Sequence, residues 1–189
     1  MATRIGRSAG GACLALVLAV TLAPESTAVG RGPDAPGRGV PGTKAFEAVA
    51  QRVLEHRTAH LVEGADPADV PLPQEGEVRV SSDQVREETA IGAELTERRT
   101  ALADAREAYE GASTRVAVES VSVTRGRVVV VAVEDTELSY RQSGGGEPPL
   151  TAFRSEHRLT FTPAPGSGWQ LTGVQTLGDG PHAVNQPEG

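Results

Sequence analysis

The chain has 189 residues, a formal net charge of −7 and a single cysteine, Cys13. An acidic balance without clusters of Lys and Arg argues against binding to nucleic acid or to anionic membrane surfaces. Because Cys13 falls within a predicted export signal, we expect the mature chain to have no disulfide, no thiolate nucleophile and no cysteine-ligated metal.

The first 28 residues have the layout of a secretory signal peptide. Arg4 and Arg7 form a basic start, residues 12–22 are an unbroken run of small and apolar residues, and small residues precede a cleavage position near Ala28. The apolar run is shorter than the roughly 20 residues that cross a bilayer. The sequence therefore predicts a Sec-type signal peptide over 1–28, a secreted or extracellular product, and no stable membrane anchor after cleavage.

A Pro/Gly-rich tether and a first helix follow the signal. Residues 29–42 carry too many Pro and Gly for a helix or strand, which predicts a disordered tether. Thr43 is expected to cap a helix with one apolar stripe, ended by Gly64 and the prolines that follow. The stripe consists of Phe46, Val49, Ala50, Val53, Leu54 and Leu61. Within the Pro-rich loop at 65–80, residues 78–80 can contribute a short extended piece.

Ser81 and Gln84 have the spacing of a helix capping box. The helix that they open is expected to run to about Glu110 and to stop at Gly111, with Gly92 as a candidate break. Its apolar stripe is thin, so we expect it to lie across the rest of the domain as a lid. The stripe consists of Ile91, Leu95, Leu102, Ala105 and Tyr109.

From Ser113 onward the apolar residues alternate with period two, which is typical of strands. We expect four strands, at 114–124, 128–140, 150–162 and 169–177. A change of parity at 119–120 predicts a β-bulge, 125–126 a tight turn and 144–149 a Gly/Pro-rich loop. The Gly/Pro-rich end, 178–189, resembles a flexible linker.

Helices that precede a run of hairpin-linked strands indicate an α+β fold. We predict one domain over 43–177, with N-terminal helices packed on a curved four-stranded antiparallel sheet. A bent sheet wrapped by helices forms a cone with a pocket, and the nuclear-transport-factor-2-like (NTF2-like) fold is the commonest version of that plan.

Several short segments between 98 and 177 carry a resemblance to a known group of proteins. They include residues 99–102, 107–109, 113–116, 136–140, 157–161 and 168–171, followed by residues 180–185 in the tail. In this order they resemble the N-terminal, non-catalytic, NTF2-like region of secreted bacterial proteins that contain an amidase domain.

The resemblance implies an accessory domain without its enzyme. In such proteins a papain-like domain with a catalytic Cys and His follows, whereas this sequence stops at Gly189 and offers no residue for those roles. The leading hypothesis is therefore a secreted, non-catalytic module that binds a cell-envelope ligand or a partner protein. A truncated amidase fragment is one alternative, kept open by the linker-like tail.

Four residues are candidates for a ligand site. His157 lies on the apolar face of the third strand, where it is either a core-edge histidine or a general base. Tyr109, Tyr140 and Trp169 belong to a small set of aromatic residues, and either they anchor the core or they converge at the mouth of the cone around a sugar or peptide.

The remaining candidates point to no cofactor and no metal. A small cone-fold isomerase or hydrolase that uses His157 or Glu137 stays open, although Asp135 and Glu137 are expected on a solvated face, with Glu134 on the opposite one. His56 and His60 have zinc-compatible spacing but no evident third ligand. The Ser155-Glu156-His157 run cannot act as a triad, because neighbours on a strand point to opposite faces.

Overall fold

The structure, a computed structural model, describes residues 39–124, 126–140 and 150–184, all within one compact unit. The predicted signal peptide, most of the tether and the 144–149 loop lie outside the described residues. No helix in the described part is long and apolar enough to cross a membrane. The elements are α1 (Thr43–Ala59), η1 (Pro67–Asp69), β1 (Val78–Val80), α2 (Ser82–Asp104), β2 (Tyr109–Thr124), β3 (Arg127–Tyr140), β4 (Leu150–Pro163) and β5 (Trp169–Ala183).

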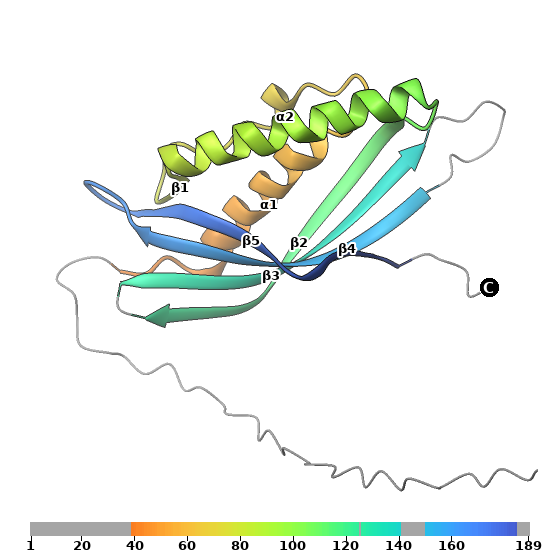
Figure 1. The fold of residues 1–189 in the computed structure, drawn as a ribbon. Helices are drawn as coiled ribbons and strands as arrows, with labels where there is room; N and C mark the ends of the chain where they lie inside the picture. Colours follow the sequence, from red (N-terminus) through yellow and green to blue (C-terminus); the bar gives the residue numbers. More distant parts are fainter. Residues whose placement is uncertain (1–38, 125, 141–149, 185–189) are drawn as a thin grey trace, which may run out of the picture. The chain divides into compact units, whose positions relative to one another are not determined.

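The fold is α+β, as predicted, with two helices packed on a strongly curled sheet (Figure 1). The sheet has five strands in the order β1-β5-β4-β3-β2, so the expectation of four was wrong. The fifth is β1, which pairs parallel to β5 with Val78 opposite Trp169. Three residues are too few to display a period of two, which is why the sequence analysis predicts only a possible short extended piece at 78–80.

The first helix begins and ends slightly differently from the prediction. Gly42 is the N-cap residue and makes no side-chain cap, so Thr43 is the first helical residue rather than the cap. The helix ends at Ala59, which leaves Leu61 outside it. The rest of the predicted stripe is buried as one face.

The second helix packs through a different face from the predicted one. Ser81 caps it by accepting the Gln84 N–H at 3.2 Å, as expected, but the helix ends at Asp104 rather than near Glu110. It runs unbroken through Gly92. Its buried residues are Gln84, Glu88 and Gly92, at i, i+4 and i+8, whereas Ile91, Leu95 and Leu102 are only partly buried.

An ion pair to the first helix explains why α2 packs through this face instead of through its apolar stripe. The Arg57 guanidinium on α1 donates to both oxygens of Glu88, at 2.6 and 2.7 Å, and Glu88 is fully buried. Gln84 donates to the same carboxylate at 2.9 Å. A bidentate, charge-assisted contact of this kind fixes the face that α2 turns towards α1, although its residues are not apolar.

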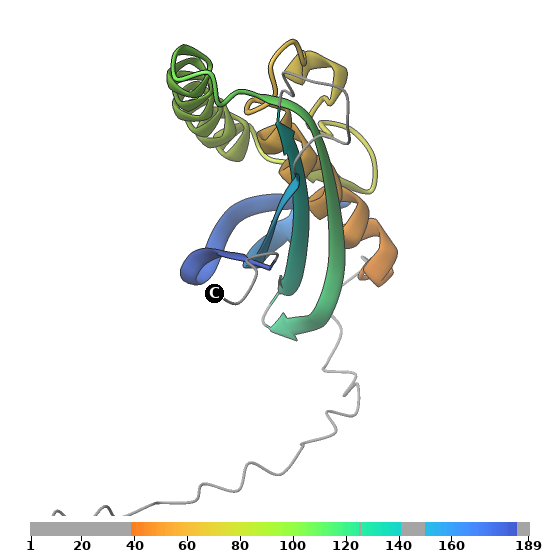
Figure 2. The same ribbon diagram turned by 90° about the vertical axis from the view of Figure 1, so that its right-hand side faces the viewer.

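The four long strands follow the predicted pattern closely. The bulge at 119–120 is present as a shift of register between Val118 and Ser120, and Figure 2 shows β2 bending along its length. Thr124 pairs with Arg127, and residue 125 of the predicted turn lies outside the described residues. At the other end, β5 continues to Ala183, which pairs with Phe153, so residues 178–183 are strand rather than part of a linker-like tail.

One face of the sheet, here called the inner face, carries the core and meets α1. Phe46 from α1 lies 4.8 Å from the Phe161 ring and 6.5 Å from Trp169, measured between ring centroids. Alternate residues of β3 continue this face along the strand. The opposite face is called the outer face. The core also includes Val116, Val128, Val130, Leu159 and Leu171.

Candidate functional site

A chain of hydrogen-bonded polar side chains crosses the inner face beside the apolar core. It takes one residue from α1, one from β2, two from β3 and one each from β4 and β5. Strand register brings them together, because Thr114 pairs with Thr136 and His157 pairs with Thr176. This set, called the polar chain, consists of Thr58, Thr114, Glu134, Thr136, His157 and Thr176.

The centre of the polar chain is a pair formed by Glu134 and His157. The Nε2 atom of His157 lies 2.8 Å from Oε2 of Glu134, and the two side chains are 5% and 15% exposed. The Thr136 hydroxyl donates to the other carboxylate oxygen, Oε1, at 2.9 Å. Both oxygens of Glu134 therefore accept a hydrogen bond inside the protein.

The other ring nitrogen of His157 is also engaged. Its Nδ1 atom lies 3.3 Å from the hydroxyl of Thr176. With a neutral imidazole, the donors and acceptors match if Nε2 carries the proton towards Glu134 and Nδ1 accepts from Thr176. Both ring nitrogens of His157 therefore have hydrogen-bond partners within the protein.

The polar chain ends at the first helix. The Thr114 hydroxyl donates to Thr58 at 2.9 Å, and Thr58 donates to the carbonyl of Leu54 at 3.0 Å. Since the hydroxyl protons of Thr114 and Thr136 are both used in these bonds, the 3.3 Å contact between the two oxygens has no proton of its own. Hydrogen bonds thus tie α1 to β2 through Thr58 and Thr114, and a second bonded group in the polar chain joins β3, β4 and β5.

A carboxylate that orients an imidazole is the arrangement from which general bases are built. Such a base needs its second nitrogen within reach of a proton that it can accept, and here that nitrogen lies 3.3 Å from the hydroxyl of Thr176. His157 itself is only 4% exposed. The pair joins β3 to β4, and its second nitrogen contacts β5.

Two of the four predicted ligand residues lie together. Tyr109 and Tyr140 pair across β2 and β3, with ring centroids 4.9 Å apart, and Thr151 donates to the Tyr140 hydroxyl at 3.3 Å. Burial, with a hydrogen bond to Tyr140, raises the pKa of Tyr109 to about 12. Tyr109 is the first residue of β2, not a helical residue as predicted.

The other two lie far from the tyrosines. His157 pairs with Ala132, about 26 Å along β3 from Tyr140 at strand spacing. Trp169 pairs with Pro163, about 20 Å along β4 from His157, and it packs in the core. The four residues therefore occupy three separate places on the sheet rather than one pocket mouth.

The predicted faces of the three carboxylates of β3 are correct, but the sequence analysis did not predict that Glu134 contacts His157. Asp135 and Glu137 lie on the outer face, where Arg154 donates to both Asp135 oxygens at 2.8 and 2.9 Å and holds the pKa of that carboxyl below its usual value. Glu134 shares the parity of Val128 and Val130, which placed it on the inner face from the start. That parity was the available signal for its contact with His157.

His56 of α1 and His60, the residue that caps the end of α1, both contact groups within the protein. His56 Nδ1 lies 2.8 Å from the carbonyl of Val70, and His60 Nδ1 lies 3.1 Å from the hydroxyl of Thr96. Burial, with neighbouring positive groups, lowers the pKa of His60. No group of three potential metal ligands is found among the described residues. Gly92 allows the close approach of α2, since a Cβ there would lie 2.5 Å from His60 Nε2.

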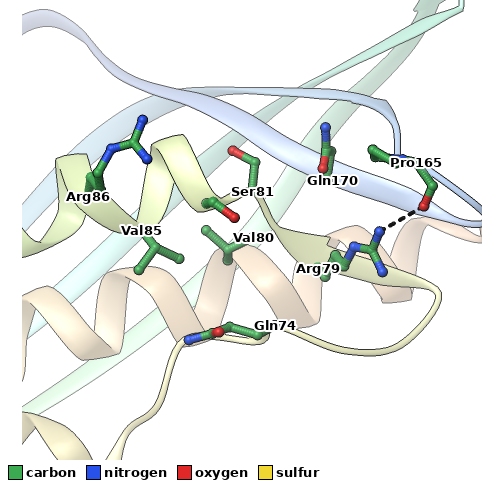
Figure 3. Close-up of a pocket in the computed structure, with 9 residues that line it drawn as sticks. Gln74, Arg79, Val80, Ser81, Val85, Arg86, Pro165 and Gln170 are labelled. Carbon is green, nitrogen blue, oxygen red and sulfur yellow. Dashed lines mark hydrogen bonds between the residues drawn. The ribbon is translucent and has the colours of Figure 1, made fainter.

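A shallow cavity of about 450 Å³ is lined by residues of β1, of the start of α2 and of β5 with the turn before it (Figure 3). Its two arginines already have partners, because Arg79 donates to the Pro165 carbonyl at 3.0 Å and Arg86 donates to Asp83. The Ser81 hydroxyl is occupied by the helix cap. None of the predicted site residues lines this cavity.

Comparison with known proteins gives little beyond this geometry. No protein-family model and no curated protein matches the chain. The intermembrane space region of the chloroplast protein ARC6 is similar at 15% identity and a TM-score of 0.44, covering 74% of this chain and 98% of that region. The Kfla4162 protein from Kribbella flavida is similar at 15% identity and a TM-score of 0.39, covering 72% of this chain and 95% of that protein.

Proposed function

We propose that the chain is an exported, non-catalytic module that acts by binding a partner protein or a cell-envelope ligand. The observation that carries this proposal is the closed polar chain. Among the described residues, His157 is the one best suited to acid–base chemistry, because the Glu134 carboxylate contacts its ring. Both of its ring nitrogens and both Glu134 oxygens, however, have hydrogen-bond partners within the protein. This internal bonding supports a role in binding rather than in turnover of a substrate.

The finer features of the proposal come from the sequence. The basic, apolar and small-residue order of residues 1–28 supports export. A curled sheet with helices packed on it supports an NTF2-like arrangement. The resemblance to the non-catalytic region of secreted amidase-domain proteins supports an accessory role beside an enzyme of that kind.

The test is an activity and binding comparison on the full chain. Purified protein is incubated with peptidoglycan and with peptide amides, and the products are measured for the parent, His157→Gln and Glu137→Gln. Glu137 is the matched control, since it is exposed on the outer face. We expect no turnover by any of the three proteins.

The binding arm uses immobilised chain and a bacterial envelope extract, with and without protease treatment of the extract. Saturable binding is expected, and its loss after protease treatment would identify the ligand as a protein. Turnover that disappears in His157→Gln but persists in Glu137→Gln would overturn the proposal.

A further inference from the structure

The second half of α2 is attached to the rest of the domain less firmly than the first half. The first half, residues 82–92, contains the three buried residues of the helix and the partly buried Val85, which packs against the core. In the second half, residues 93–104, every residue is partly buried or exposed. A segment with so few buried contacts opens locally at a small free-energy difference.

Different side chains of the α1 region hold the two halves of α2. In the first half, the Arg57 guanidinium donates to both oxygens of Glu88, and that carboxylate is fully buried. In the second half, the Nδ1 atom of His60 lies 3.1 Å from the Thr96 hydroxyl. The first half therefore depends on an arginine–carboxylate pair, whereas the second half depends on a histidine.

The hydrogen bonds of Thr96 fix the position of the proton on a neutral His60 ring. The Thr96 hydroxyl donates its own proton to the Gly92 carbonyl at 2.8 Å, so its oxygen can only accept from His60. Nδ1 of His60 therefore carries the proton, and Nε2 carries none. Nε2 is also the ring atom closest to the position that a Cβ on Gly92 would occupy, at 2.5 Å. The unprotonated nitrogen thus faces the backbone of α2.

This contact does not accommodate a second proton on His60. The proton would add to Nε2, against the CH₂ group of Gly92, and the described residues provide no hydrogen-bond acceptor for it there. The groups whose charges reach the ring are His56, from the α1 side, and Arg99, on α2, and both are basic. Arg99 is itself held close by its donation to the Val62 carbonyl at 3.2 Å. Burial and these two charges lower the pKa of His60.

We propose that mild acid releases the second half of α2 from α1, with His60 as the titrating group and Gly92 as the hinge. The first half stays attached, because the Arg57–Glu88 pair contains no group that ordinarily titrates between pH 5.5 and 7.5. Once released, a segment of about 12 residues is too short to remain a stable helix in water. Acid therefore unwinds residues 93–104 while the rest of the domain stays folded, whatever the module binds.

Both ends of the released segment suit a local opening. Gly92 lies between the two contacts to the α1 region, and glycine is the weakest helix former apart from proline. After the helix ends at Asp104, Arg106 has a φ of 64°, which is uncommon for a residue with a side chain. Tyr109, at the start of β2, is buried and fixes the chain again. The opening is therefore confined between Gly92 and β2.

The ordinary pKa of histidine, 6.5, limits the size of the pH response. The pKa of His60 is lower in the attached state, so the stability of that state is present above pH 6.5 and is lost as pH falls. If the attached state bound no proton, lowering the pH from 7.5 to 5.5 would raise the released population about tenfold. An attached state that still binds the proton weakly gives less. We therefore expect an increase between about threefold and about tenfold.

Hydrogen exchange of the full chain, followed by mass spectrometry at pH 7.5 and 5.5, tests the release. After correction for the intrinsic effect of pH on exchange, we expect residues 93–104 to exchange about three to ten times faster at pH 5.5, and residues 82–91 to change by less than about twofold. His60→Gln keeps an N–H donor for Thr96 but cannot titrate, so this response should disappear. His56→Gln is the matched control and should keep it, because His56 contacts the Val70 carbonyl rather than α2.

Electron paramagnetic resonance gives an independent measurement. In a Cys13→Ser background, a nitroxide label is attached through Glu97→Cys in the second half of α2 or through Glu87→Cys in the first half, and both glutamates are exposed. We expect acid to mobilise the label at position 97 and to leave the label at position 87 unchanged, while circular dichroism shows that each variant is folded. Three results would overturn the proposal: a second half that does not respond to pH, a response that persists in His60→Gln, or an equal response of both halves.

Discussion

Replacing Glu134 with alanine probes the polar chain at its centre. The substitution removes the acceptor for two donors, the His157 Nε2–H at 2.8 Å and the Thr136 hydroxyl at 2.9 Å. Both donors belong to buried residues, with His157 4% and Thr136 9% exposed. Since solvent reaches them poorly, water cannot fully replace the lost acceptor.

The expected loss in the free energy of unfolding follows from these two donors. A buried donor left without a partner costs about 1–3 kcal/mol. The Glu134 side chain is 15% exposed, so some water can enter the space that it leaves. We therefore expect Glu134→Ala to lower the free energy of unfolding by about 3 kcal/mol, which lowers Tm by about 10 °C for a domain of this size.

Chemical denaturation followed by circular dichroism measures this change, with the slope of the unfolding curve as a check of two-state behaviour. Glu137→Ala is the matched control, because it removes a carboxylate from the same strand on the exposed outer face. We expect the control to change stability by no more than about 0.5 kcal/mol. Glu134→Gln keeps an acceptor for His157 and should cost about 1 kcal/mol.

A Glu134→Ala variant that is no less stable than Glu137→Ala would refute this expectation. Such a result would mean that the polar chain is solvated in solution, and that His157 can be reached from outside. In that case the proposal of a non-catalytic module would lose the observation that carries it.

Three further predictions concern the helix contact and the tyrosine pair. Gly92→Ala should destabilise the fold by about 1 kcal/mol, although alanine has the better helix propensity, because the new Cβ displaces His60 from its contact with Thr96. Denaturant unfolding measures this change, and a variant more stable than the parent would contradict it. Burial lowers the pKa of His60 from 6.5, so as pH falls the unfolded chain takes up a proton at this residue before the folded chain does. The free energy of unfolding should therefore decrease as pH falls below about 6.5, and unfolding curves between pH 5 and 8 test this sign. The pKa of Tyr109 is raised from 10.0 to about 12, so the unfolded chain loses this proton first and the free energy of unfolding decreases as pH rises from 10 towards 12. In Tyr140→Phe, where Tyr109 is the remaining tyrosine, an ultraviolet absorbance titration should still find a pKa above 10 because burial is the larger cause.

The strands were the part of the fold that the sequence specified best. Alternation of apolar and polar residues identified all four long strands, and a parity change located the bulge at 119–120. Pairing between neighbours in sequence needs only short turns, so local patterns carry most of the information. β1 was not predicted as a strand of the sheet because its pairing with β5 joins segments about 90 residues apart and involves three residues.

The helix α2 shows where apolar patterning gives the wrong face. Ile91, Leu95 and Leu102 form the only apolar stripe, yet the helix turns Glu88 inward. The deciding contact is the bidentate bond from Arg57, a residue that lies on another helix. A single sequence gives no indication that these two residues meet, and a buried carboxylate without a known partner is not something patterning predicts.

The same limit applies to the candidate site, and it explains why the tyrosines, His157 and Trp169 do not converge. Their choice rested on residue type, since aromatic and imidazole groups suit ligand binding. Positions along paired strands, however, are set by register, and register places Tyr140 near one end of β3 and the partner of Trp169 at the far end of β4. Residue type identified candidates, but only the pairing of strands could place them.

The position of the polar chain suggests what it contributes to this fold. Most of the inner face is covered by valine, leucine and phenylalanine, and such side chains pack almost equally well after a slip of two residues, which keeps them on the same face. A slip that sets His157 opposite Val130 instead of Ala132 would carry its ring away from Glu134 and leave it buried without an acceptor. The Glu134–His157 bond therefore penalises this wrong pairing of β3 with β4. Residues capable of acid–base chemistry can thus occur in the middle of a sheet because they specify its register.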